Sequence, residues 1–305
     1  MQYLDHRLLH QEPEPQPEPP SDATASPRAA TELARRLPVL TPYARDATAG
    51  RVVLAQHTAD AVLVYAAFDP SIVRYATVRQ SFTGAEGADL LVPWAPERMS
   101  WIKTNFLWMQ YRSGWGTKPK QEGMVGLWLK RSLFDEILLN SVGAVRYSRV
   151  QTDEQHALRK AEAKADPTGR IVMQWDPDHL PDGSVVSHRR AVQLGLKGGW
   201  RDRVFDNSQG ELLGVVDLTE LVARLRPAAE AGADAWEQDL EVPRESVYPL
   251  PVDICDHIGA GPSPGALKMK KIRPSWTVSP LLTEARTLLV LELLPDAMEA
   301  RLVAM

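Results

Sequence analysis

Runs of apolar and β-branched residues recur through the middle of the chain and predict the strands of a sheet. The clearest run is Ala61–Phe68, which ends at an Asp-Pro turn. Four comparable runs predict further strands at 124–129, 170–175, 191–196 and 212–217. The run 170–175 is expected to stop at Asp176-Pro177, because proline lacks a backbone donor.

Helical spacing of apolar residues lies between these strands. Segments 71–81 and 132–140 show it, and 152–165 is polar and alanine-rich, which predicts a surface helix. Strands and helices interleave without the regular period of a doubly wound fold. We therefore expect an α+β fold, a mixed or antiparallel sheet with packed helices in a single main domain.

Both ends of the chain differ in composition from its middle. Residues 1–50 are rich in proline and alanine and predict a disordered or weakly ordered tail. The core domain is expected over 51–226. Residues 227–280 are rich in proline and glycine and predict a linker or covering loop, and the apolar segment 281–305 is expected to dock on the core.

Composition excludes several classes of protein. The 305 residues are 44% hydrophobic and carry a net charge of −4, unlike a disordered or collagen-like chain. The single cysteine, Cys255, excludes an intramolecular disulfide framework and fits a reducing compartment. No signal peptide or run of ~18 apolar residues is visible, so we expect a cytoplasmic protein without a membrane partner.

A tryptophan-rich segment carries the strongest signal for chemistry. Tryptophans stand seven residues apart at 94, 101, 108 and 115. Because seven residues make about two helical turns, Trp101 and Trp108 are expected to share a helical face. Between Arg98 and Arg131 seven Lys or Arg and one acidic residue give a local net charge of +6. This pattern suits an anionic ligand whose ring stacks on indole, whereas core tryptophans beside a solvated basic face are the alternative.

The candidate site combines these basic and aromatic residues with polar residues of the predicted strands. The predicted substrate-binding residues are Tyr65, Arg98, Trp101, Lys103, Trp108, Arg112, Gln174, Arg190 and Gln193. Arg98, Lys103 and Arg112 are expected to hold phosphates or carboxylates, for which arginine offers bidentate contacts. Trp101 and Trp108 are expected to stack on a base or ring.

The end of the predicted strand 170–175 supplies candidate acid–base groups. Asp176 and His179 are the predicted catalytic residues, since a carboxylate and an imidazole can both transfer protons at a reacting centre. An Asp-Pro turn beside a surface histidine is the alternative interpretation. The spacing is too loose for a metal site, and the cluster Asp253–His257 has no second half, so no metal is expected.

Three blocks of the sequence resemble one known family. The most specific is RMSWIKTNFLWMQYRSGW at 98–115, and the others are VLVY at 62–65 and VMQWDPD at 172–178 followed by RAVQLGL. Together they resemble the domain of unknown function 4291 family over about residues 52–226. Thr104 stands where that family has proline, and Ala66 stands where it has glutamine. The resemblance implies a shared fold and carries no established activity.

Three functions from different classes remain open. The first is a transferase acting on an anionic, nucleotide-like or carboxylate small molecule. NAD is then one candidate substrate, in an ADP-ribosyltransferase-like reaction, although no Arg-Ser-Glu or His-Tyr-Glu set is recognisable. The second is a non-catalytic module for nucleotides or single-stranded nucleic acid, against which the net negative charge argues. The third is a structural or interaction protein with its tryptophans in the core.

Overall fold

The computed structural model describes residues 36–45, 48–88, 90 and 94–261. A sheet of eight strands forms its centre. These are β2 (Gly50–Arg51), β4 (Ala61–Phe68), β5 (Ser100–Lys103), β6 (Gly123–Lys130), β7 (Val142–Gly143), β8 (Gly169–His179), β9 (Val185–Gly198) and β10 (Leu212–Asp217). Their order is β10-β6-β4-β5-β9-β8-β7, and β2 lies beside β9. Only the β2–β9 and β7–β8 pairs are parallel.

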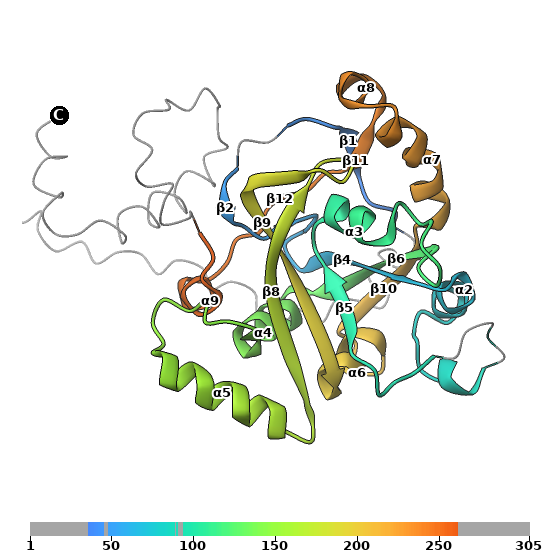
Figure 1. Cartoon of the computed structure of the whole chain (residues 1–305). Helices are drawn as coiled ribbons and strands as arrows, with labels where there is room; N and C mark the ends of the chain where they lie inside the picture. Colours follow the sequence, from blue (N-terminus) through green and yellow to red (C-terminus); the bar gives the residue numbers. More distant parts are fainter. Residues whose placement is uncertain (1–35, 46–47, 89, 91–93, 262–305) are drawn as a thin grey trace, which may run out of the picture.

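Helices cover both faces of this sheet (Figure 1). One face packs against α2 (Pro70–Arg79), α4 (Arg131–Asn140), α6 (Gly199–Phe205) and α9 (Val252–Ile258). The other packs against α3 (Phe106–Ser113), α7 (Thr219–Glu230) and α8 (Ala233–Asp239). The predicted α+β class is confirmed. In the described part of the chain no helix combines the length and apolar character needed to cross a membrane.

Strand β4 shows why its apolar run was a strong signal. Val62 and Val64 belong to the core under α2 and α4, whereas Leu63 and Tyr65 belong to the core under α3 and α7. All four side chains are fully buried. A strand buried on both faces has no polar alternation and reads as a continuous hydrophobic segment.

Strand β8 runs on through the Asp-Pro turn at which we expected it to stop, so that expectation is wrong. Pro177 pairs with Arg190 of β9, and a bulge follows between Pro177 and Asp178. A bulge tolerates proline. On its other edge β8 pairs with β7 only at Val172 and Met173. At Pro177 that edge has no partner strand among the described residues, so the N–H that proline lacks is not needed for pairing. Asp176 therefore stays in the sheet.

The described residues after Arg226 build part of the core. Helix α7 continues through Pro227, and α8, β11 (Glu241–Pro243), β12 (Ser246–Val247) and α9 follow. Trp236 and Ile254 are buried, one in each core. This differs from the expected linker, because enough apolar side chains are spaced along the segment to give it a buried side. Residues 1–35 and 281–305 lie outside the described residues.

Two small pairings join the beginning of the described chain to its end. Strand β1 (Leu40–Pro42) pairs with β11, and β3 (Leu54–Ala55) pairs with β12. Arg51 and Gly261 exchange backbone hydrogen bonds of 2.9 and 2.8 Å. The sheet is thus enclosed by segments about 200 residues apart in sequence.

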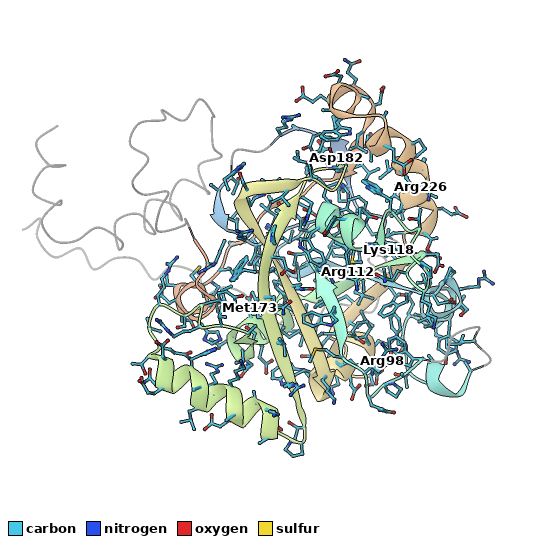
Figure 2. All side chains as sticks on the ribbon, in the orientation of Figure 1. Arg98, Arg112, Lys118, Met173, Asp182 and Arg226 are labelled. Atoms are coloured by element: carbon cyan, nitrogen blue, oxygen red, sulfur yellow. The ribbon has the colours of Figure 1, made fainter. Side chains whose placement is uncertain are left out.

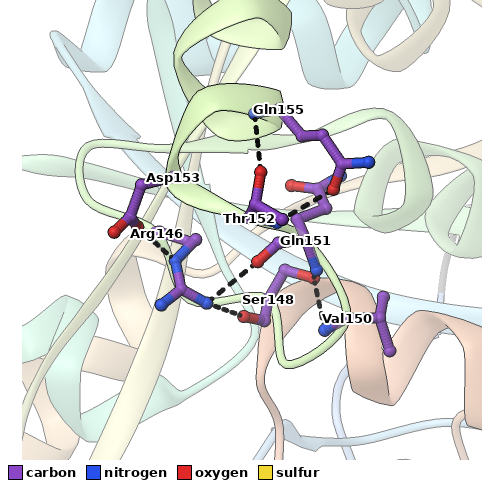
Figure 3. Close-up of polar contacts among 7 residues, drawn as sticks. All are labelled: Arg146, Ser148, Val150, Gln151, Thr152, Asp153 and Gln155. Carbon is purple, nitrogen blue, oxygen red and sulfur yellow. Dashed lines mark hydrogen bonds and ion pairs between the residues drawn. The ribbon is translucent and has the colours of Figure 1, made fainter.

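Helix α5 (Asp153–Ala165) has no buried residue, which confirms the predicted surface helix. Its stability depends on its first turn, shown in Figure 3. The Thr152 hydroxyl accepts from the Gln155 N–H at 3.2 Å, and the Gln155 side chain accepts from the Thr152 N–H at 2.9 Å. Arg146 adds an ion pair with Asp153 and hydrogen bonds to the carbonyls of Ser148 and Gln151.

We expect Trp236→Ala to lower the free energy of unfolding by about 3–5 kcal/mol, as for other buried tryptophans. The side chain is 2% exposed, meets Tyr43 edge to face, and donates from Nε1 to the Ala229 carbonyl at 2.8 Å. Glu237→Ala, an exposed neighbour on the same helix, is the control and should change stability by under ~0.5 kcal/mol. Urea denaturation measures both, and equal effects would contradict the packing of α8.

Candidate functional site

A cleft opens where β4 and β5 separate. The two strands share one residue pair, Tyr65 with Lys103. Had the ladder continued, Ala67 would face Trp101; both instead line a cleft of about 550 Å³. The remaining lining residues are Phe68, Asp69, Ile72, Trp94, Ala95, Arg98, Met99, Ser100, Lys103, Met109, Arg112, Pro119, Lys120, Gln121 and Gln193. Figure 2 shows Arg98 and Arg112 near opposite ends of β5.

Four polar side chains form a row across the sheet, and two of them, Lys103 and Gln193, line this cleft. Tyr65 of β4 pairs with Lys103 of β5, which pairs with Gln193 of β9, which pairs with Gln174 of β8. Directly paired residues point to the same face of a sheet, here the face under α3. Gln193 donates from Nε2 to Oε1 of Gln174 at 2.6 Å. All four were predicted from the sequence, and the strand register brings them into one line.

Helix α3 carries Trp108 onto this row. The Asn105 side chain accepts from the Trp108 N–H at 2.7 Å and caps the helix, so Trp101 lies on a strand and Trp108 on a helix. The expected shared helical face is therefore wrong. The Lys103 ammonium lies 4.6 Å from the Trp108 ring centre, and the lysine side chain is 4% exposed. Trp108 Nε1 has no hydrogen-bond partner in the described part of the protein.

The surroundings of Lys103 disfavour its charged form. Burial, and secondly the positive charge of Arg112, lower the pKa of Lys103 to about 7, whereas Asp176 acts in the opposite direction. Among the described residues no carboxylate oxygen lies within 4.0 Å of its Nζ. Roughly half of the Lys103 side chains are thus neutral amines at neutral pH.

The two predicted catalytic residues lie in different places, and neither lines the cleft. Asp176 shares the sheet face of Gln174, and burial raises its pKa against the opposing charges of Lys103 and Arg190. Its Oδ2 has no hydrogen-bond partner in the described region. His179 stacks on Tyr111 with ring centres 3.6 Å apart and does not line the cleft. Arg190 also lies outside the cleft lining, and its positive charge acts on Asp176.

The mouth of the cleft is basic. Arg98, Arg112 and Lys120 are exposed there, and Asp69 is the one acidic residue among the described lining. Arg112 donates from Nη1 to the Gln121 side chain at 3.0 Å, which holds its guanidinium at the rim. An anion entering the cleft therefore meets several fixed positive charges.

Trp101 is the tryptophan placed to stack on a ligand. It is half-buried and lines the cleft, whereas Trp94, which also lines it, and Trp108 and Trp115 are at least 92% buried. Its neighbour across the ladder is Gly195, where an added Cβ would lie 2.9 Å from the Trp101 ring. The glycine allows the indole to lie against β9.

Glu245 is a site residue that sequence reasoning missed. Its Oε1 accepts from the Phe106 N–H at 2.6 Å, where α3 begins. Burial raises the pKa of Glu245 well above its usual range. Burial also raises the pKa of Tyr65, and the charge of the nearby Glu245 carboxylate raises it further. The Tyr65 hydroxyl has no described hydrogen-bond partner. No local pattern marks Glu245, because it meets the site across 139 residues of sequence.

Within the described residues no group of three or more His, Cys, Asp or Glu is arranged to hold a metal ion. Cys255 packs in the core under α9, and Nε2 of His257 lies 2.8 Å from the Ser141 carbonyl oxygen. The cluster Asp253–His257 is therefore part of a helix that anchors the fold.

Fold and cleft together define an α+β protein with a basic, tryptophan-lined cleft between β4 and β5 of its central sheet. The chain belongs to the family described as domain of unknown function (DUF4291), whose model matches residues 52–248. The match extends beyond the expected end at 226 to Tyr248, which is buried in the core. Comparison with curated proteins and with solved structures finds no match.

We expect Lys103→Met to be more stable than the wild type at pH 6, by roughly 3–5 kcal/mol, and to lose this advantage towards pH 10. Between pH 7 and 10.5 the unfolded lysine binds more protons than the folded one, so wild-type stability rises with pH there. Denaturation midpoints across this range measure the difference.

Lys197→Met removes an exposed lysine of β9 and serves as the control, with a difference that stays constant with pH. Parallel pH curves for Lys103→Met and the wild type would contradict the lowered pKa of Lys103.

Proposed function

We propose that this protein is an enzyme of the transferase class that binds an anionic, nucleotide-like or carboxylate small molecule in the cleft between β4 and β5. One observation carries the proposal: Arg98, Lys103, Arg112 and Lys120 line a single cleft with Trp101. Its volume of about 550 Å³ falls within the range of small-molecule sites, ~300–1,000 Å³. A fixed cluster of cations beside an indole suits a ligand with an oxyanion and a ring.

The cleft divides the work among its residues. Arg112 and Arg98 offer two separate positions for an oxyanion at the rim, Trp101 stacks on the ring, and Gln193 offers a hydrogen bond from the floor. Asp176 is the acid–base group, because burial raises its pKa and its Oδ2 lacks a described hydrogen-bond partner. Neither Asp176 nor His179 lines the cleft, but the charge of Asp176 acts on Lys103, whereas His179 stacks on Tyr111 and takes no part in the proposed reaction.

The ligand is sought by thermal denaturation of the purified chain with ADP, ATP, NAD, sugar phosphates and small carboxylates. A ligand at 100 times its Kd should add ~2.7 kcal/mol and raise Tm by roughly 5 °C. Arg112→Ala should abolish most of this rise. Mass spectrometry of the ligand after incubation then shows whether it is converted.

Arg224→Ala is the matched control, since Arg224 is an exposed arginine of α7 that does not line the cleft. It should leave the rise in Tm intact. A rise that survives Arg112→Ala, or no rise with any of these anions, would overturn the proposed site.

A non-catalytic module for single-stranded nucleic acid is the second candidate. It is favoured by the continuation of the basic rim along exposed Lys118 and Lys120, beside the half-buried Trp101.

Affinity for a thymidine oligonucleotide, measured against salt concentration, discriminates between the two. A module that neutralises four phosphates should show a slope of roughly −3 in log K against log salt. We expect no such binding, because the whole chain is net negative and the basic residues surround a cleft rather than an extended groove.

A further inference from the structure

Lys103 is an unusual residue for an anion-binding cleft. Its side chain is 4% exposed and still lines the cavity, with the amine 4.6 Å from the centre of the Trp108 ring. A buried ammonium ordinarily has a carboxylate partner, yet in the described structure none lies within 4.0 Å of this one. Because burial without a carboxylate partner disfavours its positive charge, this amine is poorly suited to binding an oxyanion.

The groups around Lys103 come from four elements. Arg112 and Trp108 face it from α3, Tyr65 from β4, Gln193 from β9 and Asp176 from β8. Burial and the Arg112 guanidinium disfavour the ammonium, whereas the Asp176 carboxylate and the face of the Trp108 ring favour it. A lysine desolvated beside another cation is the established way of making an amine nucleophilic at neutral pH.

The exposed lysines of the same region are held differently. Lys118 donates from Nζ to the backbone carbonyls of Tyr111 and Arg112 at 3.2 and 2.8 Å, which requires its protons. Lys120 stands at the exposed rim. Lys103 alone among the described cleft lysines combines burial with a free approach from the cavity.

We propose that Lys103 is the nucleophile of this cleft and forms an imine with an aldehyde or ketone that also carries a carboxylate or phosphate. The anionic end binds Arg112, whose charge acts on Lys103, and this places the carbonyl carbon near the amine. This inference rests on the proposed function and narrows its substrate class to anionic carbonyl compounds. It also reassigns Lys103 from oxyanion binding to covalent chemistry.

The covalent step balances with the groups present. The Nζ lone pair forms a bond to the carbonyl carbon, and the carbonyl π electrons move to oxygen. That oxygen takes one proton from the nitrogen and one from solvent relayed by the Asp176 side chain, and leaves as water while the nitrogen lone pair completes the C=N bond. The product is a protonated imine facing the Asp176 carboxylate, which stabilises its positive charge.

Reductive trapping tests the proposal on the full chain. Glyoxylate with sodium cyanoborohydride at pH 7 converts an imine-forming lysine to carboxymethyl-lysine, which peptide mass spectrometry locates. We expect Lys103 to react at least ~10-fold faster than exposed Lys164 and Lys197, because its neutral fraction is roughly 10³ larger. Its rate should level off above pH ~8, whereas the exposed lysines continue to accelerate.

Acetaldehyde, which lacks the carboxylate, is the matched probe. It should label Lys103 about 10-fold more slowly than glyoxylate, on the assumption that one arginine contact contributes ~1.4 kcal/mol. Arg112→Ala should remove the preference. Lys103→Arg should abolish labelling at this position and leave Lys164 and Lys197 unchanged, with its thermal melt reporting that the variant is folded.

Labelling of Lys103 no faster than that of Lys197 would overturn the proposal. The proposed function would then still stand if ADP or another anion raised Tm in the wild type and not in Arg112→Ala. Equal rates with the two aldehydes would overturn the anionic substrate class.

Discussion

The turn at Asn105 fixes the position of helix α3 on the sheet, and the other residues near the cleft depend on that position. Its side chain accepts from the Trp108 N–H, and its amide nitrogen lies 3.5 Å from the Asp178 carboxylate on β8. The next residue, Phe106, donates its N–H to Glu245, beyond β11. Helix α3 is thereby tied at its first turn to β8 and to the chain that follows β11. This attachment lays the helix over the strands, and Trp108 follows onto Lys103.

The same face carries a cost in stability. The Tyr65 hydroxyl, Trp108 Nε1 and Asp176 Oδ2 are buried without hydrogen-bond partners among the described residues. Each such group costs about 1–3 kcal/mol relative to a bonded one. The opposite face, under α2 and α4, is almost entirely apolar and supplies compensating burial. These three positions are therefore places where the fold gives up hydrogen-bond energy.

Sequence patterns predicted the individual strands and helices better than the way in which these elements pair and pack. The run Ala61–Phe68 announced β4 because burial on both faces removes all polar interruptions. The four polar residues from Tyr65 to Gln174 could be selected from the sequence by residue type. That they form one row depends on the register of three strand pairs, which no single segment determines. The seven-residue spacing of Trp101 and Trp108 misled because it crosses a strand-to-helix boundary. Asn105, a standard helix cap, was the local signal for that boundary.

The pairing of β1 with β11, and of Arg51 with Gly261, has a consequence for biosynthesis. Strands near the start of the domain find their partners only after about 200 more residues have been made. Until then the first strands present unpaired edges and apolar faces. A ribosome-bound chain that ends near residue 230 therefore cannot close the domain. Chaperones should therefore bind mainly to the incompletely paired N-terminal half during synthesis, and this binding should cease once α9 has emerged from the ribosome.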